Sequence, residues 1–258
     1  MILAVDTGIK NLSFCVMSAD DNKCMSSYKI HLWDVYNTVD SHQLCSTVQK
    51  NGKICNKKCS FKVKNIDIVN IDNDDFYCKS HLPKDVKSSK YSPKKVNDYL
   101  LQDIAKNMIE KINTIYSENI ELFNKLDTII LELQPSINSK MGFISHIIFG
   151  KLVELMIDTK CIIKFVRASQ KLKAYTGPEI ECKLKTPYAK RKWLSVRYTR
   201  WIIENKFSEE QKEIWLEDFN KCNNKLDDRS DTFLYCVNNL FGCITKRQKM
   251  NFKKNNIK

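Results

Sequence analysis

The chain has 258 residues and 43% hydrophobic content, enough for one large domain with a buried core or one domain carrying an insertion. Lys and Arg number 43 against 30 Asp and Glu, so the formal charge is +13, which favours a polyanionic partner such as nucleic acid. A solvated lysine-rich surface is the alternative reading of this charge. No apolar stretch approaches the roughly 18–20 residues of a membrane span, so we expect no membrane partner.

The N-terminal residues M-I-L-A-V-D-T-G enter a strand directly, without a basic or Arg-rich leader. We therefore expect no targeting segment and a soluble, intracellular protein. Seven of the 11 cysteines are spread singly, as in reduced intracellular proteins, and only four gather in one segment.

Three short apolar segments open the chain, at 2–6, 12–18 and 28–36, and the turn signals between them predict an antiparallel meander. A polar segment with four cysteines, 41–84, interrupts this rhythm. We expect 1–40 and 85–245 to form the main domain, 41–84 to be an insert and 246–258 to be a basic tail.

The second half alternates strands and helices. Helical spacing predicts helices over 94–117, 138–157, 188–205 and 208–217, and apolar runs predict strands over 126–135 and 161–167. A last helix begins at L-D-D-R-S-D (226–231). This alternation predicts an α/β fold with a mixed sheet flanked by helices.

Acidic residues stand at three of these boundaries. Asp6 and Glu132 end apolar strands, where open α/β sheets collect functional groups, and Asp228 and Asp231 share one helix face. First-turn aspartates also stabilise a helix dipole, which is the structural alternative. If the four carboxylates converge, their repulsion calls for cations. Two Mg²⁺ ions in a phosphodiester-cleaving site would supply them.

The motifs V-D-T-G-I-K-N-L (5–12), I-I-L-E-L-Q-P (129–135) and L-D-D-R-S-D-T-F (226–233), in this order, resemble the RuvC-like Holliday junction resolvases of the poxvirus and mitochondrial branch. The basic segment 185–196 resembles the helix start that precedes the last motif in that family. These proteins belong to the ribonuclease H-like superfamily. The resemblance covers most of 1–18 and 92–245 but not the insert.

The resemblance implies a metal-dependent endonuclease that resolves four-way (Holliday) DNA junctions as a homodimer. It implies two Mg²⁺ ions per active site, with Mn²⁺ as a substitute, bound by the catalytic acids Asp6, Glu132, Asp228 and Asp231. Lys190, Arg191 and Lys192 are the expected DNA phosphate contacts. Asp227 is expected as a cap or an outer residue, and Gln134 either orients a ligand or has a structural role. A viral origin would place the protein in the cytoplasm of an infected cell.

Cysteines and a histidine in the insert have the spacing of metal ligands. Cys45, Cys55, Cys78 and His81 form two pairs that predict a structural Zn²⁺ site of the Cys₃His type. Cys59 is a substitute ligand or an additional, unbound cysteine, and His42 is a weaker candidate. The lysines around these ligands indicate a DNA-facing finger or a solvated charged face.

Other functions remain open at this point. A related ribonuclease H-like nuclease acting on flaps or RNA–DNA hybrids has the same motifs, and a junction-binding protein without activity has the same fold. D-T-G-I-K-N also resembles the phosphate loop of actin-like and sugar kinases. Only six glycines are present, too few for the further Gly-rich loops of those kinases.

Overall fold

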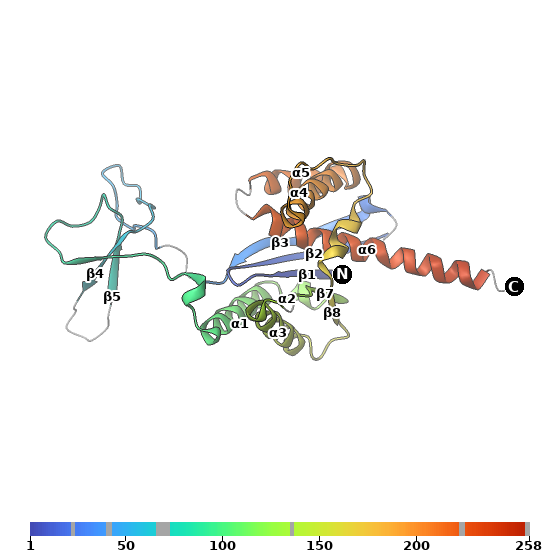
Figure 1. Ribbon diagram of the computed structural model, residues 1–258, viewed down its shortest axis with the longest axis horizontal. Coiled ribbons are helices and arrows are strands. Elements are labelled where there is room, and N and C mark those ends of the chain that lie inside the picture. Colours follow the sequence, from blue (N-terminus) through green and yellow to red (C-terminus); the bar gives the residue numbers. More distant parts are fainter. Residues whose placement is uncertain (22–23, 40–42, 66–72, 135–136, 222–224, 256–258) are drawn as a thin grey trace. The chain divides into compact units, whose positions relative to one another are not determined.

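The computed structural model describes the chain except residues 22–23, 40–42, 66–72, 135–136, 222–224 and 256–258 (Figure 1). Two compact units are present. The first consists of Met1–Thr38 and Leu101–Lys258, and the second is Val39–Leu100. Among the described residues, no helix is both long and apolar enough to cross a membrane.

A five-stranded sheet with the order β3-β2-β1-β7-β8 forms the centre of the first unit. Its strands are β1 (Ile2–Thr7), β2 (Asn11–Ala19), β3 (Tyr28–Asn37), β7 (Thr128–Glu132) and β8 (Ile162–Val166), with a short 3-10 helix, η1 (Met25–Ser27), before β3. The first three strands are antiparallel neighbours, so the predicted meander is confirmed. β7 and β8 add in parallel to β1.

The β1–β2 turn requires its glycine. A Cβ atom added to Gly8 would lie 2.5 Å from the backbone oxygen of Asn11, closer than any side chain tolerates. Gly8 therefore allows the chain to reverse two residues after Asp6, which keeps this acid at the end of β1.

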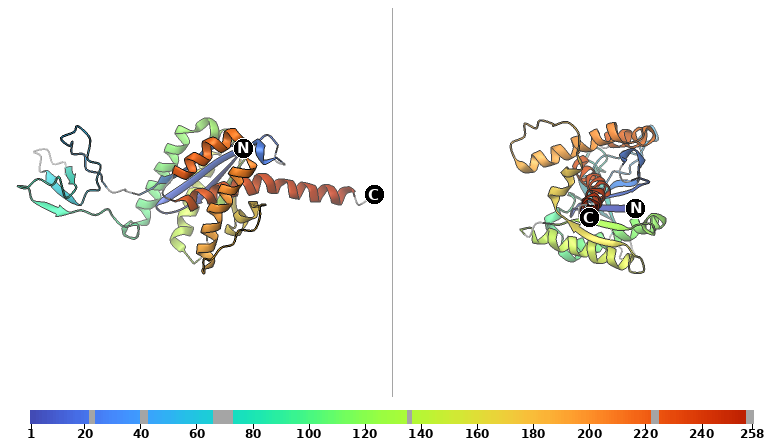
Figure 2. Two further views of the ribbon diagram at one scale, coloured as in Figure 1. Left: turned by 90° about the horizontal axis from the view of Figure 1, so that it is seen from above. Right: turned by 90° about the vertical axis from the view of Figure 1, so that its right-hand side faces the viewer.

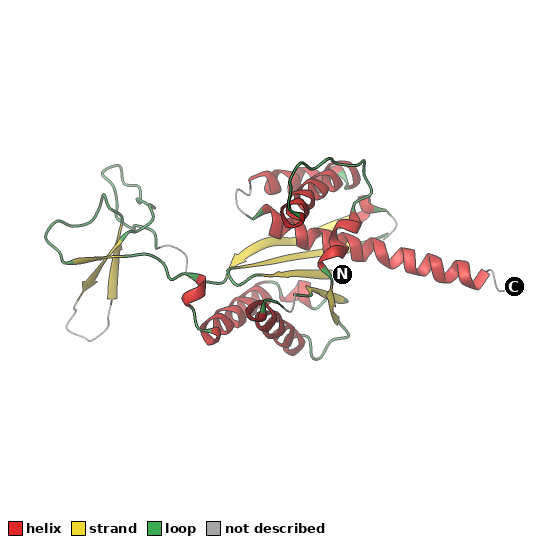
Figure 3. Ribbon diagram, viewed as in Figure 1, coloured by secondary structure: helices red, strands yellow, loops and turns green. Residues whose placement is uncertain are grey.

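Helices cover both faces of the sheet, which confirms the predicted α/β class (Figures 1 and 3). On one face lie α1 (Leu101–Glu118), α2 (Ile120–Phe123) and α3 (Ser139–Leu155). On the other lie α4 (Pro187–Lys206), α5 (Glu209–Lys221) and the first half of α6 (Leu226–Asn255), as the end view of Figure 2 shows. The 3-10 helix η3 (Ala168–Ala174) follows β8 and packs against α6.

Alternation along the strands directs the acids to the α6 face. Ile2 and Ala4 of β1 and Ile130 of β7 belong to the buried cluster that contains the apolar side of α6. Asp6 lies two residues after Ala4, and Glu132 lies two residues after Ile130. Because successive side chains of a strand point to opposite faces, both acids point to the same face as these buried residues. Since Val5 pairs with Leu131, the two acids end neighbouring parallel strands on the face that α6 covers.

Two predicted helix boundaries differ from the structure. The helix expected over 94–117 begins at Leu101, because the 3-10 turn η2 (Val96–Asp98) is followed by an extended Tyr99. At the other end, the helical backbone of α6 continues through most of 246–258, to Asn255.

The second unit contains little regular structure. Its three-stranded antiparallel sheet has the order β5-β4-β6, formed by β4 (Phe61–Asn65), β5 (Asn73–Tyr77) and β6 (Ser88–Lys90). Loops make up most of the remainder, as Figure 3 shows. Its described core consists chiefly of Cys45, Cys59 and Cys78, with Cys55, Phe76 and Tyr91 packed around them. A unit with so few aliphatic core residues needs another source of stability.

Candidate active site and metal centre

One cavity of about 410 Å³ in the first unit is lined by Asp6, Glu132, Asp228 and Asp231. Two of these acids come from the ends of β1 and β7, and two come from the first turns of α6. The structure therefore brings together the four acids that the sequence predicts as metal ligands. Asp228 and Asp231 lie on one side of α6 because they are three residues apart.

A lysine that the sequence analysis did not single out lies among these acids. The Nζ atom of Lys171, in η3, donates to Asp231 Oδ2 at 2.5 Å and to Glu132 Oε2 at 3.2 Å. The Lys171 side chain is 9% exposed. Its position shortly after β8 could have indicated this, because β8 is the neighbour of β7 and the carboxyl ends of adjacent parallel strands lie at the same edge of the sheet.

Burial makes this acidic cluster difficult to ionise. Desolvation, followed by the charges of Asp231 and Glu132, raises the pKa of Asp6 well above its ordinary value, although Lys171 opposes this shift. Burial also raises the pKa of Asp231 to about 6, against the lowering effect of Lys171. For Asp228, burial and then the neighbouring Asp227 raise the pKa. The cluster therefore contains more negative charge than one lysine neutralises.

An unsatisfied atom indicates where further positive charge fits. Oδ1 of Asp231 is buried and has no hydrogen-bond partner within the described structure. A buried carboxylate oxygen without a partner is strongly unfavourable unless a cation or a water binds it. Carboxylate oxygens are also the ligands that Mg²⁺ prefers. The donor set and the unpartnered oxygen thus fit divalent metal binding.

Two hydrogen bonds orient groups at the cavity wall. The hydroxyl of Tyr235, one turn after Asp231 on α6, donates to Glu132 Oε2 at 2.5 Å. The amide nitrogen of Gln134 donates to Thr7 Oγ1 at 2.7 Å, and both residues line the cavity. Gln134 thus links the end of β7 to the end of β1 and also faces the site.

The basic residues predicted to contact phosphate occupy the first turns of α4. Arg191 and Lys192 line the cavity together with Tyr188, whereas Lys190 is exposed and is not part of the cavity wall. Lys192 forms an ion pair with Asp227 and lies 5.2 Å from the ring centre of Tyr188. Although burial opposes it, this pairing lowers the pKa of Asp227. Asp227 therefore connects α6 to α4 through this ion pair, and it does not line the cavity.

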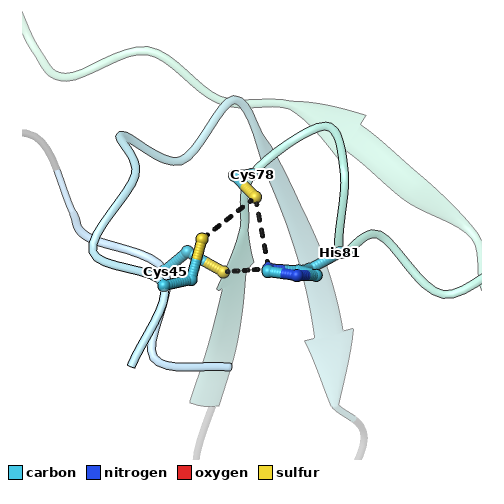
Figure 4. A group of neighbouring side chains, drawn as sticks. Cys45, Cys78 and His81 are labelled. Atoms are coloured by element: carbon cyan, nitrogen blue, oxygen red, sulfur yellow. Dashed lines mark hydrogen bonds between the residues drawn. The ribbon is translucent and has the colours of Figure 1, made fainter. Parts of the chain in front are cut away.

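A second cluster of potential ligands lies in the second unit. The ligand atoms of Cys45, Cys55, Cys78 and His81 all lie within 4.8 Å of one another. His81 Nδ1 is 3.5 Å from Sγ of both Cys45 and Cys78, and Sγ of Cys55 and Cys78 are 3.8 Å apart. Figure 4 shows Cys45, Cys78 and His81 directed at one another. These are the four residues that the sequence predicts as a Cys₃His site.

The surroundings of Cys45 favour its thiolate. Burial alone would raise its pKa, but hydrogen bonds from the Cys78 backbone, from Thr47 and from His81 lower the pKa to about 6. Cys59 packs in the same cluster but is not one of the four gathered ligands, and burial raises its pKa. His42 lies outside the described residues.

The fold resembles that of a solved Holliday junction resolvase. The yeast mitochondrial Holliday junction resolvase Ydc2 aligns with a TM-score of 0.52 at 15% identity, over 98% of this chain and 83% of that chain. RuvC of Thermus thermophilus, solved in complex with a Holliday junction substrate, aligns with a TM-score of 0.45 at 6% identity, over 95% of each chain.

No family model matches the chain. Among curated proteins, an uncharacterized protein of Acanthamoeba polyphaga mimivirus is 24% identical in an alignment of 258 positions, gaps included, that covers 87% of this chain. The alignment spans 58% of the mimivirus protein, so this chain corresponds to little more than half of that relative. A viral homologue therefore exists.

Proposed function

We propose that this chain is a divalent-metal-dependent endonuclease that resolves four-way (Holliday) DNA junctions by hydrolysing phosphodiester bonds. The observation that carries the proposal is the convergence of Asp6, Glu132, Asp228 and Asp231 on one cavity from three separate elements. The sheet order and the likeness to the fold of a Holliday junction resolvase support it. Neither kinase-like phosphate loops nor a nucleophilic side chain is needed for this chemistry.

The four carboxylates would bind two Mg²⁺ ions, or Mn²⁺ in their place. When bound, such ions lower the pKa of a water that attacks phosphorus and stabilise the charge on the attacking and leaving oxygens. Glu132 and Asp231 are held in place by Lys171, and Tyr235 orients Glu132 further. These contacts hold the carboxylates of Glu132 and Asp231 in the cavity against their mutual repulsion when the acids are ionised.

Basic groups at the rim of the cavity would position the DNA backbone. Arg191 lines the cavity and is exposed, so its guanidinium can make a bidentate contact with a phosphate. Lys192 already forms an ion pair with Asp227, and its contribution to DNA binding is correspondingly smaller than that of Arg191. Lys190, on the outer side of the same helical turn, would contact a more distant phosphate.

The Cys/His cluster would hold a structural Zn²⁺ ion. A tetrahedron with Zn–S bonds of about 2.3 Å and Zn–N bonds of about 2.0–2.1 Å has S···S edges of about 3.8 Å and S···N edges of about 3.6 Å. The distances of 3.8 Å and 3.5 Å between these ligand atoms agree with both edges. Four protein ligands complete a tetrahedral shell, so the ion would stabilise the second unit and take no part in hydrolysis.

A homodimer follows from the substrate. Symmetric resolution of a four-way junction requires two cuts related by a two-fold axis, and a two-fold dimer supplies two active sites in that relation. Light scattering of the protein should give a mass near twice the 30.2 kDa of one chain. A complex with junction DNA that contains only one protein chain would exclude this arrangement.

Cleavage of matched substrates tests the function. Labelled four-way junctions, flaps, RNA–DNA hybrids and plain duplexes of one sequence are incubated with the protein in Mg²⁺, with Asp228→Asn as the control. We expect paired cuts near the branch point of the junction and loss of cleavage in the variant. Preferred cutting of flaps or hybrids would assign a related ribonuclease H-like nuclease, and binding without cutting would leave a junction-binding protein.

The mimivirus relative supports a viral origin, and with it an action on branched DNA in the cytoplasm of infected cells. Fractionation of infected cells tests this placement. Recovery of the protein only from the nuclear fraction would contradict it.

A further inference from the structure

A hairpin in the second unit carries the first half of the metal cluster. Backbone hydrogen bonds join Cys45 N to Lys57 O at 2.8 Å, Cys55 N to Thr47 O at 3.0 Å, and Gln49 N to Lys53 O at 2.8 Å. The tip turns at Gly52, whose φ of 76° suits glycine. We call residues 43–59 the lysine hairpin.

Positive charge on this hairpin is not balanced locally. Residues 43–59 contain four lysines and no acidic residue, although the whole chain has 30 acids. Lys50, Lys53, Lys57 and Lys58 are all exposed, and no ion pair between described residues involves any of them. Elsewhere in the described chain several exposed lysines do pair with acids, for example Lys29 with Asp20.

The hairpin also borders an open hollow of about 560 Å³, which Val48 lines together with polar side chains. Its wall includes the ammonium-bearing side chains of Lys50 and Lys57 and the uncharged polar side chains of Thr47 and Asn51. His81 lines the hollow as well, and its Nδ1 atom faces the thiols of Cys45 and Cys78. If Nδ1 binds a metal, the proton of the neutral imidazole is on Nε2, which can then donate a hydrogen bond. Every polar group named here can donate a hydrogen bond, and none carries negative charge.

An apolar pair lies beside the lysines. Val48 and Ile54 face each other across the hairpin and are 64% and 54% exposed. Apolar side chains flanked by lysines suit DNA, where sugars and exposed bases adjoin the phosphates, better than they suit bulk solvent. The combination distinguishes this hairpin from an ordinary solvated charged face.

We propose that the hollow of the lysine hairpin is a binding site for the phosphate backbone of DNA, with Lys50 and Lys57 as its principal contacts. The inference deepens the proposed nuclease function by assigning a DNA-binding role to the second unit, separate from the acidic cavity. With a metal bound, the Cys/His cluster would fix the shape of the hairpin, because Cys45 and Cys55 lie on its two arms.

DNA binding by the full chain tests this site without requiring cleavage. Affinity for fluorescent duplex and junction DNA is measured between about 50 and 200 mM salt, with Ca²⁺ replacing Mg²⁺, for the wild type and for Lys50→Gln/Lys57→Gln. Each lost phosphate contact reduces the magnitude of the negative slope of log K against log salt by about 0.9, so the magnitude should fall by about 1.8 in the double variant, which should bind on the order of tenfold more weakly. Zinc content is measured on the same samples to show that the hairpin is intact.

The matched control is Lys84→Gln/Lys87→Gln, which removes the same charge from exposed positions of the same unit outside the hollow. It should change the slope by much less than the hairpin variant. An unchanged slope in the hairpin variant, an equal change in the control, or wild-type protein that binds no DNA would each overturn the site. If the wild type binds DNA through the hairpin but cuts no junction, the nuclease proposal fails and the hairpin site stands.

Discussion

Lys171 Nζ lies 2.5 Å from Asp231 Oδ2 and 3.2 Å from Glu132 Oε2, so a single buried ammonium bridges acids from α6 and β7. This bridge joins the helix to the sheet at the candidate active site. It supplies one positive charge to a cluster of four carboxylates. The remaining negative charge favours the binding of cations, in agreement with the proposed metal-dependent function.

Replacing Lys171 tests this balance. Lys171→Met leaves Glu132 and Asp231 buried without their cation, so we expect a loss of about 3 kcal/mol in the free energy of unfolding in Mg²⁺-free buffer. Added Mg²⁺ should restore more stability to the variant than it adds to the wild type. Thermal unfolding with and without Mg²⁺ measures both effects. Lys173→Met, at an exposed position of the same 3-10 helix, is the control, and equal destabilisation by the two changes would contradict the role of Lys171.

Asp6→Asn should abolish cleavage and yet stabilise the metal-free protein. The folded pKa of Asp6 lies well above its unfolded value, chiefly because the carboxyl is buried. Ionised Asp6 therefore destabilises the fold at neutral pH. This destabilisation is absent below the unfolded pKa and grows as the pH rises toward the folded pKa.

We expect the melting temperature of the Asp6→Asn variant to exceed that of the wild type by a few degrees, on the order of 1 kcal/mol, at neutral pH without Mg²⁺. The difference should disappear near pH 4. The surface change Asp158→Asn, which removes the same charge, should leave the melting temperature unchanged at both pH values. A melting temperature below that of the wild type at neutral pH would show that the Asp6 charge is already compensated.

Loss of a ligand at the Cys/His cluster should affect only the second unit. Cys78→Ser should lower zinc content below one ion per chain and make Val39–Leu100 sensitive to protease, because metal binding supplies much of the stability of a unit with so small a core. The thermal transition of the first unit should not move. Cys59→Ser is the matched control and should retain zinc, since Cys59 is outside the gathered set. Equal zinc loss in both variants would make Cys59 a ligand.

Tyr235→Phe isolates the hydrogen bond to Glu132 from the packing of the ring. A hydrogen bond to a charged group contributes about 1.5–3 kcal/mol, so single-turnover junction cleavage should slow by tenfold or more. Tyr116→Phe, which removes a hydroxyl from α1 on the other face of the sheet, should cleave at the wild-type rate. A wild-type rate for Tyr235→Phe would show that Lys171 alone positions Glu132.

Local sequence patterns were sufficient for the elements of the first unit. Alternating and helical spacing of apolar residues predicted every strand of the main sheet and each long helix to within a few residues, apart from the start of α1 and the end of α6. The short strands of the second unit were not predicted, because their residues are polar and lack a clear period.

The acids could be predicted because each stands at an element boundary, where strand ends and helix starts carry recognisable signals. The lysine among them was not predicted, because K-L-K at 171–173 resembles an ordinary basic loop and only its place after a strand distinguishes it. The approach of η3 to α6 directs Lys171 inward and leaves Lys173 exposed. The same holds for Lys192, which reads as a free phosphate contact until α6 brings Asp227 to it.

The sequence by itself determined the succession of strands and helices in the first unit, the identity of the acidic residues and the spacing of the cysteines, because these depend on neighbours along the chain. Only the tertiary structure decided which charges meet. Ionisation, ion pairing and metal affinity depend on separations of a few ångströms and on exclusion of water. Those distances arise when β1, β7, η3 and α6 pack together.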